Sequence, residues 1–198
     1  MAVDKRTVME VEFVSQAPGG LETVREFVNT YDVDDGTDAL ATPDALARWL
    51  REHGLLDEDE DAGATRADVR RAAALRDSLR EVLLGHHGGY EIDPAALAGI
   101  EDAARRARLE LRFGPDGTAR PEPARGGVDG ALGRLLALVA EAQAGGTWQR
   151  LKVCPADDCQ WAFYDRSRNR SAVWCNMAVC GNRAKVRSYR ERHAHRAV

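Results

Sequence analysis

All four cysteines of the chain lie in its last quarter, in two pairs of equal spacing. Four residues separate Cys154 from Cys159, four separate Cys175 from Cys180, and fifteen lie between the pairs. Zn²⁺ takes four thiolates in a tetrahedron at about 2.3 Å, and each short pair can span one edge of it. The spacing therefore predicts one tetrahedral site with one zinc ion per chain.

Other uses of four cysteines fit this sequence less well. A disulfide framework is typical of small secreted chains, whereas this chain has 198 residues and no apolar run near its start. Both spacings differ from the C-x-x-C of redox pairs. An iron–sulfur cluster and unliganded thiols remain as alternatives. No stretch approaches the ~18 apolar residues of a membrane span. We therefore expect a cytoplasmic protein with reduced thiols and no membrane partner.

Charge divides the chain into two parts. Residues 151–198 contain ten Lys or Arg and four Asp or Glu, a formal charge of +6, whereas residues 1–150 carry 18 basic and 28 acidic residues, a charge of −10. A zinc ion with four thiolates carries −2, so the metallated tail keeps about +4. This asymmetry indicates either a polyanionic partner for the tail or docking of the tail on the acidic body.

The cysteine segment predicts a small finger of treble-clef-like order. After the first pair, residues 161–165 alternate as a strand does, residues 167–170 form a turn, and the chain returns to Cys175. So short a segment cannot bury a conventional core. We therefore expect three aromatic rings to cover the metal: Trp161, Phe163 and Trp174. Cys180 should lie near the start of the closing helix, where free amides favour a thiolate.

A basic helix is expected after Cys180. Its basic residues include Arg183, Lys185, Arg187, Arg190 and Arg192, and its one acidic residue is Glu191. Next to a metal fold, such a helix favours contacts with DNA phosphates. The alternative is a helix whose arginines are solvated or complement its dipole. His193 and His195 are not expected to bind zinc, because four thiolates saturate the site.

The first 150 residues predict a mainly helical body. Apolar residues recur at helical spacing in five segments, which begin near Leu21, Pro43, Arg66, Pro94 and Leu132. Thr42 and Thr65 are expected to cap two of them. A strand is expected over residues 7–13, a hairpin around the turn at 114–117, and a loop over 121–127. The fold class is therefore α+β, with a predominantly helical domain at 1–148, one or two small β elements, and the zinc finger at 149–198.

No motif in the body indicates an enzyme. A phosphate loop, a dinucleotide fingerprint and a nucleophile elbow are all absent from the sequence. His53, His86 and His87 form no recognisable constellation, and the last two are expected to be exposed at a helix end. Asn29 follows Phe27 and Val28 on the apolar first helix, so it is either a buried amide bonded to a neighbouring loop or a ligand-binding residue. We expect a non-enzymatic protein whose effector is unknown.

The finger resembles the CGNR zinc finger, a family named after the residues at 180–183. Two motifs carry the resemblance: Cys154-x4-Cys159-x-Trp161-x-Phe163-x-Asp165-x-Ser167-Arg168-Asn169, and Trp174-Cys175-x-Met177-x2-Cys180-Gly181-Asn182-Arg183-x-Lys185. Arg166 and Asn176 depart from it, since a small residue and a serine are usual there. Neither position belongs to the four ligands.

Members of that family usually carry the finger behind an ABATE domain, described as a stress-induced transcription regulator of bacteria. Residues 26–30 are similar to its Asp-Phe-Val-Asn-Thr motif, with Glu26 for Asp, and residues 49–56 fit its Trp-Leu…Gly-Leu-Leu pattern. The resemblance implies a regulator in which the finger and basic helix contact DNA while the body senses a signal or forms a homodimer. The alternative is an interaction or structural module whose finger packs on the body and binds no nucleic acid.

Overall fold

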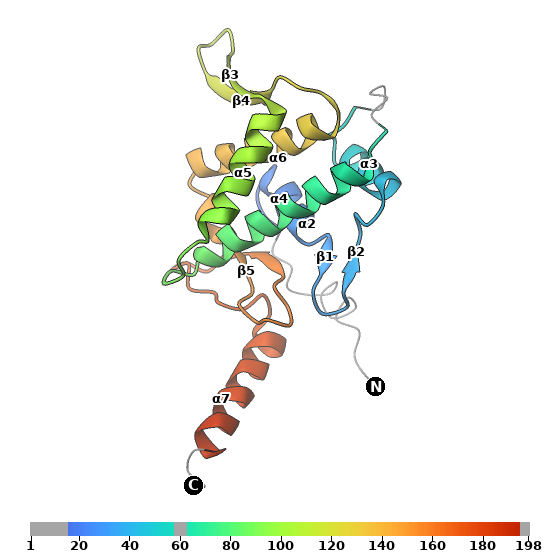
Figure 1. The fold of residues 1–198 in the computed structure, drawn as a ribbon. Helices are drawn as coiled ribbons and strands as arrows, with labels where there is room; N and C mark the ends of the chain where they lie inside the picture. The colour runs from blue at the N-terminus through green and yellow to red at the C-terminus, as the bar shows by residue number, and fades with distance from the viewer. Residues whose placement is uncertain (1–15, 58–62, 195–198) are drawn as a thin grey trace.

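A computed structural model describes residues 16–57 and 63–194, so the strand expected at 7–13 and most of the acidic run at 57–61 lie outside the described residues. The helices of the body lie together, and the last helix extends away from them (Figure 1). The body contains α2 (Leu21–Val28), α3 (Pro43–Glu52), α4 (Arg66–Gly85), α5 (Pro94–Ala107) and α6 (Gly127–Ala144). The C-terminal part adds the 3-10 turn η1 (Trp148–Arg150), the π-helical turn η2 (Met177–Gly181) and α7 (Asn182–Ala194).

The strands within the described residues form three antiparallel pairs. These are β1 (Tyr31–Asp32) with β2 (Thr37–Asp38), β3 (Leu109–Phe113) with β4 (Ala119–Pro123), and β5 (Leu151–Val153) with β6 (Ala162–Tyr164). The predicted hairpin at 114–117 is confirmed, whereas the loop expected at 121–127 is wrong in its first half, because β4 extends to Pro123. The mainly helical α+β class is confirmed.

Local sequence signals fix where the helices begin. The Thr42 hydroxyl accepts a hydrogen bond from the Ala45 amide at 3.2 Å at the start of α3. At the start of α4, Thr65 and Asp68 form the predicted capping box, in which each side chain bonds the other residue's amide. Such caps satisfy amides that have no partner within the helix.

The core joins the body to the first part of the finger. Phe27 and Val28 of α2 are fully buried, as predicted, and pack with apolar residues of α4 and α6. Leu151, Val153 and Ala162 belong to the same cluster. The β5–β6 hairpin is therefore built into the body's core, although it lies beyond the predicted boundary at 148. On α5, Leu97 is 45% exposed.

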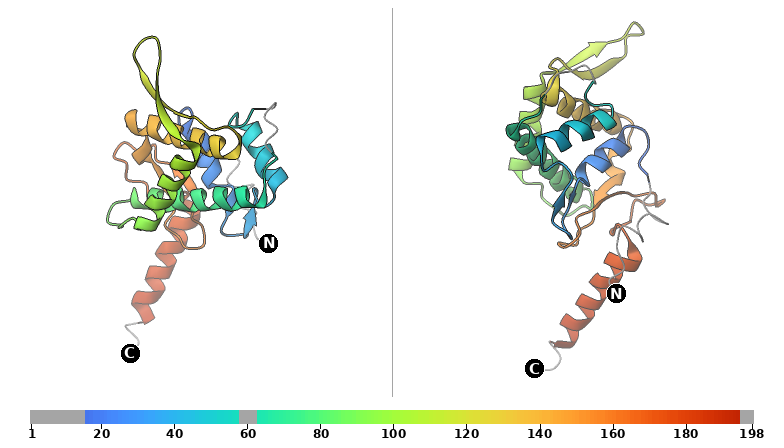
Figure 2. Two further views of the ribbon diagram at one scale, coloured as in Figure 1. Left: turned by 45° about the horizontal axis from the view of Figure 1, so that its top comes forward. Right: turned by 90° about the vertical axis from the view of Figure 1, so that its right-hand side faces the viewer.

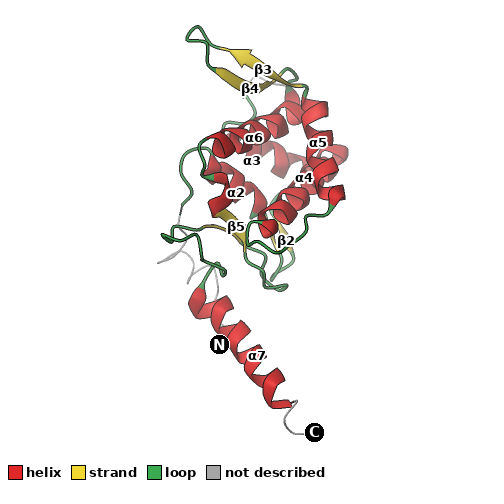
Figure 3. Ribbon diagram, turned by 90° about the vertical axis from the view of Figure 1, so that its left-hand side faces the viewer, coloured by secondary structure: helices red, strands yellow, loops and turns green. Residues whose placement is uncertain are grey.

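Two elements project from opposite ends of this body. The β3–β4 hairpin extends from one end and α7 from the other, in all views (Figures 1, 2 and 3). None of the described helices combines the length and the apolarity needed to cross a membrane.

Candidate metal centre and basic helix

The four cysteines meet at one point. Their Sγ atoms all lie within 4.8 Å of one another. Cys159 and Cys175 are 3.6 Å apart, and Cys175 and Cys180 are 3.7 Å apart. A tetrahedral zinc–thiolate site with bonds of about 2.3 Å has edges of about 3.8 Å, so the arrangement fits this ion. The predicted zinc site, with Cys154, Cys159, Cys175 and Cys180 as ligands and one ion per chain, is confirmed.

The first two ligands are positioned by the β5–β6 hairpin. Cys154 follows β5 directly, and its amide donates to the Trp161 carbonyl at 2.9 Å. The amides of Cys159 and Gln160 both donate to the Ala156 carbonyl, which closes the knuckle between the strands. The strand expected over 161–165 is confirmed as β6, but its partner is β5 and not the segment that returns to Cys175.

A buried ion pair shapes the loop that leads to Cys175. Lys152 on β5 donates to Asp165 Oδ2 at 2.8 Å, and its ammonium also donates to the carbonyls of Arg170 and Ala172. Asp165 accepts from the hydroxyl and amide of Ser167 and from the amide of Ala172. Both charged residues are buried. Every donor of the ammonium has a partner, so the loop is tied to β5.

Of the last two ligands, Cys175 lies just before a capped π-helical turn and Cys180 lies within it. Asn176 accepts hydrogen bonds from the amides of Ala178 and Val179 and so caps η2. Serine is also a good N-cap residue, so this departure from the family pattern keeps the same function. Cys180 is in the last turn of η2, at the start of α7, as predicted.

The residues after Cys180 support it in three different ways. A side chain at Gly181 would place Cβ only 2.4 Å from Met177 Sδ and 3.2 Å from Trp174 Cδ1, so both side chains would have to shift to admit it. Asn182 donates to the Ala178 carbonyl at 3.0 Å. Arg183 donates to Asp158 Oδ2 at 2.8 Å and to Cys180 Sγ at 3.4 Å.

The thiols cannot all ionise while they share this space. Cys154 accepts a hydrogen bond from Cys159, which lowers the pKa of Cys154 to about 7 and raises the pKa of Cys159. The pKa of Cys180 is lowered by hydrogen bonds from the other three thiols and also from Arg183. Zinc binding replaces these shared protons and allows four thiolates, so metal binding releases protons.

The body holds the β5–β6 hairpin on both sides. The Asn29 amide donates to the Ala162 carbonyl at 2.9 Å and accepts from the Ala162 amide at 2.7 Å. His86 Nδ1 donates to the Leu151 carbonyl and His87 Nε2 to the Val153 carbonyl, at 2.7 and 2.6 Å. The prediction that the two histidines are exposed is therefore wrong, because both are half-buried against β5. A ligand-binding role for Asn29 stays a prediction.

Burial lowers the pKa of both histidines, and the carbonyl that each donates to offsets part of this effect. Their neutral form is therefore favoured. His53 lies apart from this pair, stacked on Trp49 and 3.2 Å from a Glu26 oxygen.

Of the aromatic residues near the zinc site, one lies next to a metal ligand and another packs against the body. Trp174 lies against Gly181, next to the ligand Cys180. Phe163 is buried, with its ring centroid 6.4 Å from that of His87, which follows α4. The lid expected over the metal is therefore only partly formed by the rings that the sequence suggested.

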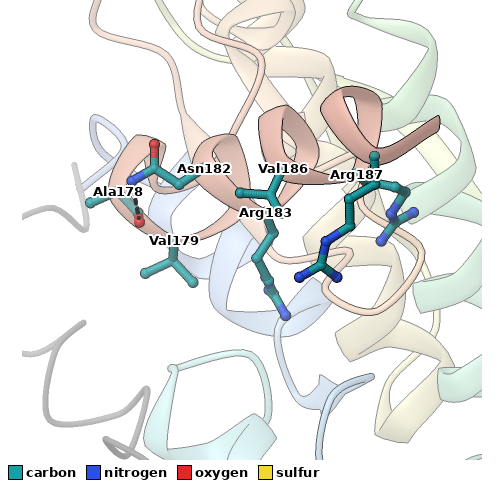
Figure 4. Close-up of a pocket in the computed structure, with 7 residues that line it drawn as sticks. Ala178, Val179, Asn182, Arg183, Val186 and Arg187 are labelled. Carbon is teal, nitrogen blue, oxygen red and sulfur yellow. Dashed lines mark hydrogen bonds between the residues drawn. The ribbon is translucent and has the colours of Figure 1, made fainter. Parts of the chain in front are cut away.

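The basic helix presents its charges to solvent. Four of its predicted residues are exposed: Lys185, Arg187, Arg190 and Arg192. Arg183 is half-buried and shared between Asp158 and Cys180, so it supports the metal centre. A shallow groove of about 640 Å³ lies along η2 and α7 (Figure 4), lined by Ala178, Val179, Asn182, Arg183, Val186, Arg187 and Arg190.

The residues that the sequence did not single out for the site are Lys152, Asp158 and the histidines that hold β5. Asp165 and Ser167 stood in the family motif, but their role in folding the loop did not follow from it. Lys152 alone carried a signal, since a charged residue between Leu151 and Val153 on a buried strand needs a partner.

Comparison with known families agrees with this geometry. Residues 150–193 match the CGNR zinc finger. No curated protein matches the chain. Residues 22–145, more than half of the chain, match the ABATE family, described as "Putative stress-induced transcription regulator". The chain therefore belongs to the ABATE family and carries a CGNR zinc finger behind that domain.

Proposed function

We propose that this protein is a zinc-binding bacterial transcription regulator of the cytoplasm, active in a stress response and without enzymatic activity, whose α7 contacts DNA phosphates. The observation that carries the proposal is the set of exposed basic residues Lys185, Arg187, Arg190 and Arg192 on a helix that extends away from an acidic body. Phosphate contacts supply much of the affinity of such interfaces. The body then senses a signal or mediates dimerisation.

The geometry of α7 supports this role over docking on the body. Residues 185–190 are all exposed, so their positive charge is not neutralised by the acids of residues 1–150. The zinc site holds the first turn of the helix through Cys180 and Arg183. A helix whose first turn is held in place and whose later turns expose basic side chains can lie along a nucleic-acid groove.

Salt dependence of duplex DNA binding tests the proposal. Each phosphate neutralised contributes about −0.9 to the slope of log K against log salt. The variant Arg187→Ala/Arg190→Ala should reduce that slope by about two units and leave the zinc content unchanged. Arg48→Ala/Arg51→Ala, which removes two exposed arginines from α3, is the matched control and should leave the slope as it is.

The proposal fails if the zinc-loaded protein binds no duplex DNA at low salt, or if both double variants change the slope equally. In the second case binding depends on net charge and not on α7.

A protein-interaction module is the second candidate, and one observation favours it. Val186 and Tyr189 on α7 are 49% and 57% exposed, and Val186 lines the groove among the arginines. An apolar strip bordered by arginines also suits an acidic amphipathic segment of another protein. The two candidates differ in one measurement, because Val186→Ala should weaken a protein partner strongly but change the salt slope for DNA little.

A further inference from the structure

The β3–β4 hairpin has one apolar face and one charged face. The cross-strand pairs on the apolar face are Leu109 with Pro123, Leu111 with Pro121, and Phe113 with Ala119. Leu111 is 66% exposed and Phe113 is 73% exposed. A two-stranded hairpin that leaves its apolar face in water has little stability of its own. Leu109, at the base of the hairpin, packs against the core, so the part of this face that stays in water is the outer part, at Leu111 and Phe113.

The outer edge of β3 is open. Opposed residues of an antiparallel pair alternate between those that exchange hydrogen bonds and those that do not. The amide of Gly114 donates to the Thr118 carbonyl at 2.9 Å, and that of Ala124 donates to the Arg108 carbonyl at 3.1 Å. The even-numbered residues of β3 thus bond to β4. The amides and carbonyls of Leu109, Leu111 and Phe113 point outward, and β4 is the only described strand paired with β3.

The outer edge of β4 is closed by its sequence. By the same alternation, Pro121 and Pro123 occupy outward positions, and proline has no N–H to donate. Prolines on an edge strand prevent the addition of another strand. Strand addition to this hairpin can therefore occur only along β3.

The charged face places like charges opposite each other across the two strands. Glu110 lies opposite Glu122, and Arg112 lies opposite Arg120. Like charges directly across a strand pair destabilise it. Along β3 itself, Glu110 lies 3.3 Å from Arg112 and 3.8 Å from Arg108, in ion pairs that are exposed to water and therefore weak. The open side of β3 can still add a further opposite charge to Glu110 and to Arg112.

A second copy of β3 supplies that charge in one register. When two antiparallel copies are centred on Leu111, Glu110 of each lies beside Arg112 of the other, and Leu109 lies beside Phe113. Centring the pair on Glu110 or on Arg112 places like charges in contact. The sequence Leu-Glu-Leu-Arg-Phe is therefore complementary to itself in one arrangement.

We propose that the protein forms a homodimer through antiparallel pairing of β3 with β3 of a second copy, centred on Leu111. The two hairpins then form one four-stranded sheet, whose polar face is neutralised by Glu110–Arg112 pairs. This inference specifies the dimerising role included in the proposed function, but its test uses no DNA, so the two can fail separately.

The test exchanges charges between copies. In Glu110→Arg and in Arg112→Glu, each homodimer places like charges in contact, whereas a mixture of the two variants restores both opposite-charge pairs. A strand pair is a small interface, so the dimer should be weak and form only at high protein concentration. Sedimentation of the wild type, measured in a series that reaches about 100 µM, should show the dimer at the upper end of the series. Each variant alone should be monomeric, and the equimolar mixture should be dimeric again.

Glu101→Arg and Arg105→Glu serve as controls, because they reverse the charges of an exposed ion pair on α5. Both should leave the dimer unchanged. A monomeric wild type over the whole concentration range overturns the proposal. So does a dimer that survives both β3 variants, or a mixture that stays monomeric.

Discussion

Individual side chains, rather than a flexible linker, connect the zinc finger to the body. The Asn29 amide bonds both polar groups of Ala162, a residue 133 positions away, and the two histidines after α4 bond the carbonyls of β5. Ala162 is fully buried, so water cannot replace Asn29.

Asn29→Ala should therefore destabilise the whole protein. It leaves the Ala162 amide and carbonyl buried without partners, and each unsatisfied group costs about 1–3 kcal/mol. The free energy of unfolding from urea titration measures this loss. Gln143→Ala, which removes an exposed amide from α6, is the control and should change stability by less than about 0.5 kcal/mol. Equal effects in the two variants would exclude this role for Asn29.

Asp165→Asn should have a larger effect, because it leaves the Lys152 ammonium buried without a counter-charge. Removal of one partner of a buried ion pair costs about 3–5 kcal/mol. Zinc affinity, measured by competition with a chelator, should fall as well, since Asp165 folds the loop before Cys175. Asp157→Asn makes the same charge change at an exposed position of the knuckle and should leave both quantities near the wild-type values. A normal zinc affinity in Asp165→Asn would show that the loop does not position Cys175.

At the scale of single residues, the sequence predicts contacts between residues that are close together in the chain. The spacing of the cysteines specified the ligands, because both members of each pair lie in one turn of chain. The partners of Asn29, His86 and Lys152 could not be predicted, since they depend on how distant segments pack, and no periodicity records that.

Among the elements, the β5–β6 hairpin differs most from expectation. The alternation at 161–165 identified a strand but not its partner, because pairing depends on the register with residues 151–153. Leu151 to Val153 is too short to show a period of its own. The helices were predictable for the opposite reason, since their caps and apolar stripes lie within the segment that folds.

Loss of zinc should unfold one part of the finger and leave another part folded. In Cys175→Ser, we expect β5 and β6 to keep their protection from hydrogen exchange, because Leu151, Val153 and Ala162 remain in the core. The knuckle between the strands and the η2 turn should exchange rapidly, since coordination holds them. Mass spectrometry of exchanged peptides distinguishes these regions, and exchange of metal-loaded wild type is the reference. Rapid exchange in β6 as well would show that the hairpin depends on the metal.

At the scale of the molecule, the contact between α4 and β5 makes stability depend on pH. Burial lowers the pKa of His86 and His87 below their ordinary 6.5, while Lys152 nearby acts in the same direction and Asp165 opposes it at His87. The unfolded chain then binds more protons than the folded one below pH 6.5, so stability is full above that pH and decreases as the pH falls through the folded pKa.

The variant His86→Gln/His87→Gln should lose this part of the pH dependence. Its free energy of unfolding should fall less steeply than that of the wild type between about pH 6.5 and pH 5. Release of zinc at low pH affects both proteins equally, so the difference between them reports the histidines. His53→Gln is the control, and a slope equal to that of the double variant would refute the assignment.

The direction of α7 has a cause different from that of the other helices. Cys154 and Cys159 belong to a hairpin set in the core, whereas Cys175 lies just before the turn from which α7 begins and Cys180 lies within that turn. A metal ion held by these four thiolates, together with the Arg183–Asp158 ion pair, would therefore fix the angle between body and helix in place of a hydrophobic interface. Coordination of this kind does not weaken on cooling, whereas apolar contacts do. A chelator or an oxidant would instead free the helix while every apolar contact of the body stays in place.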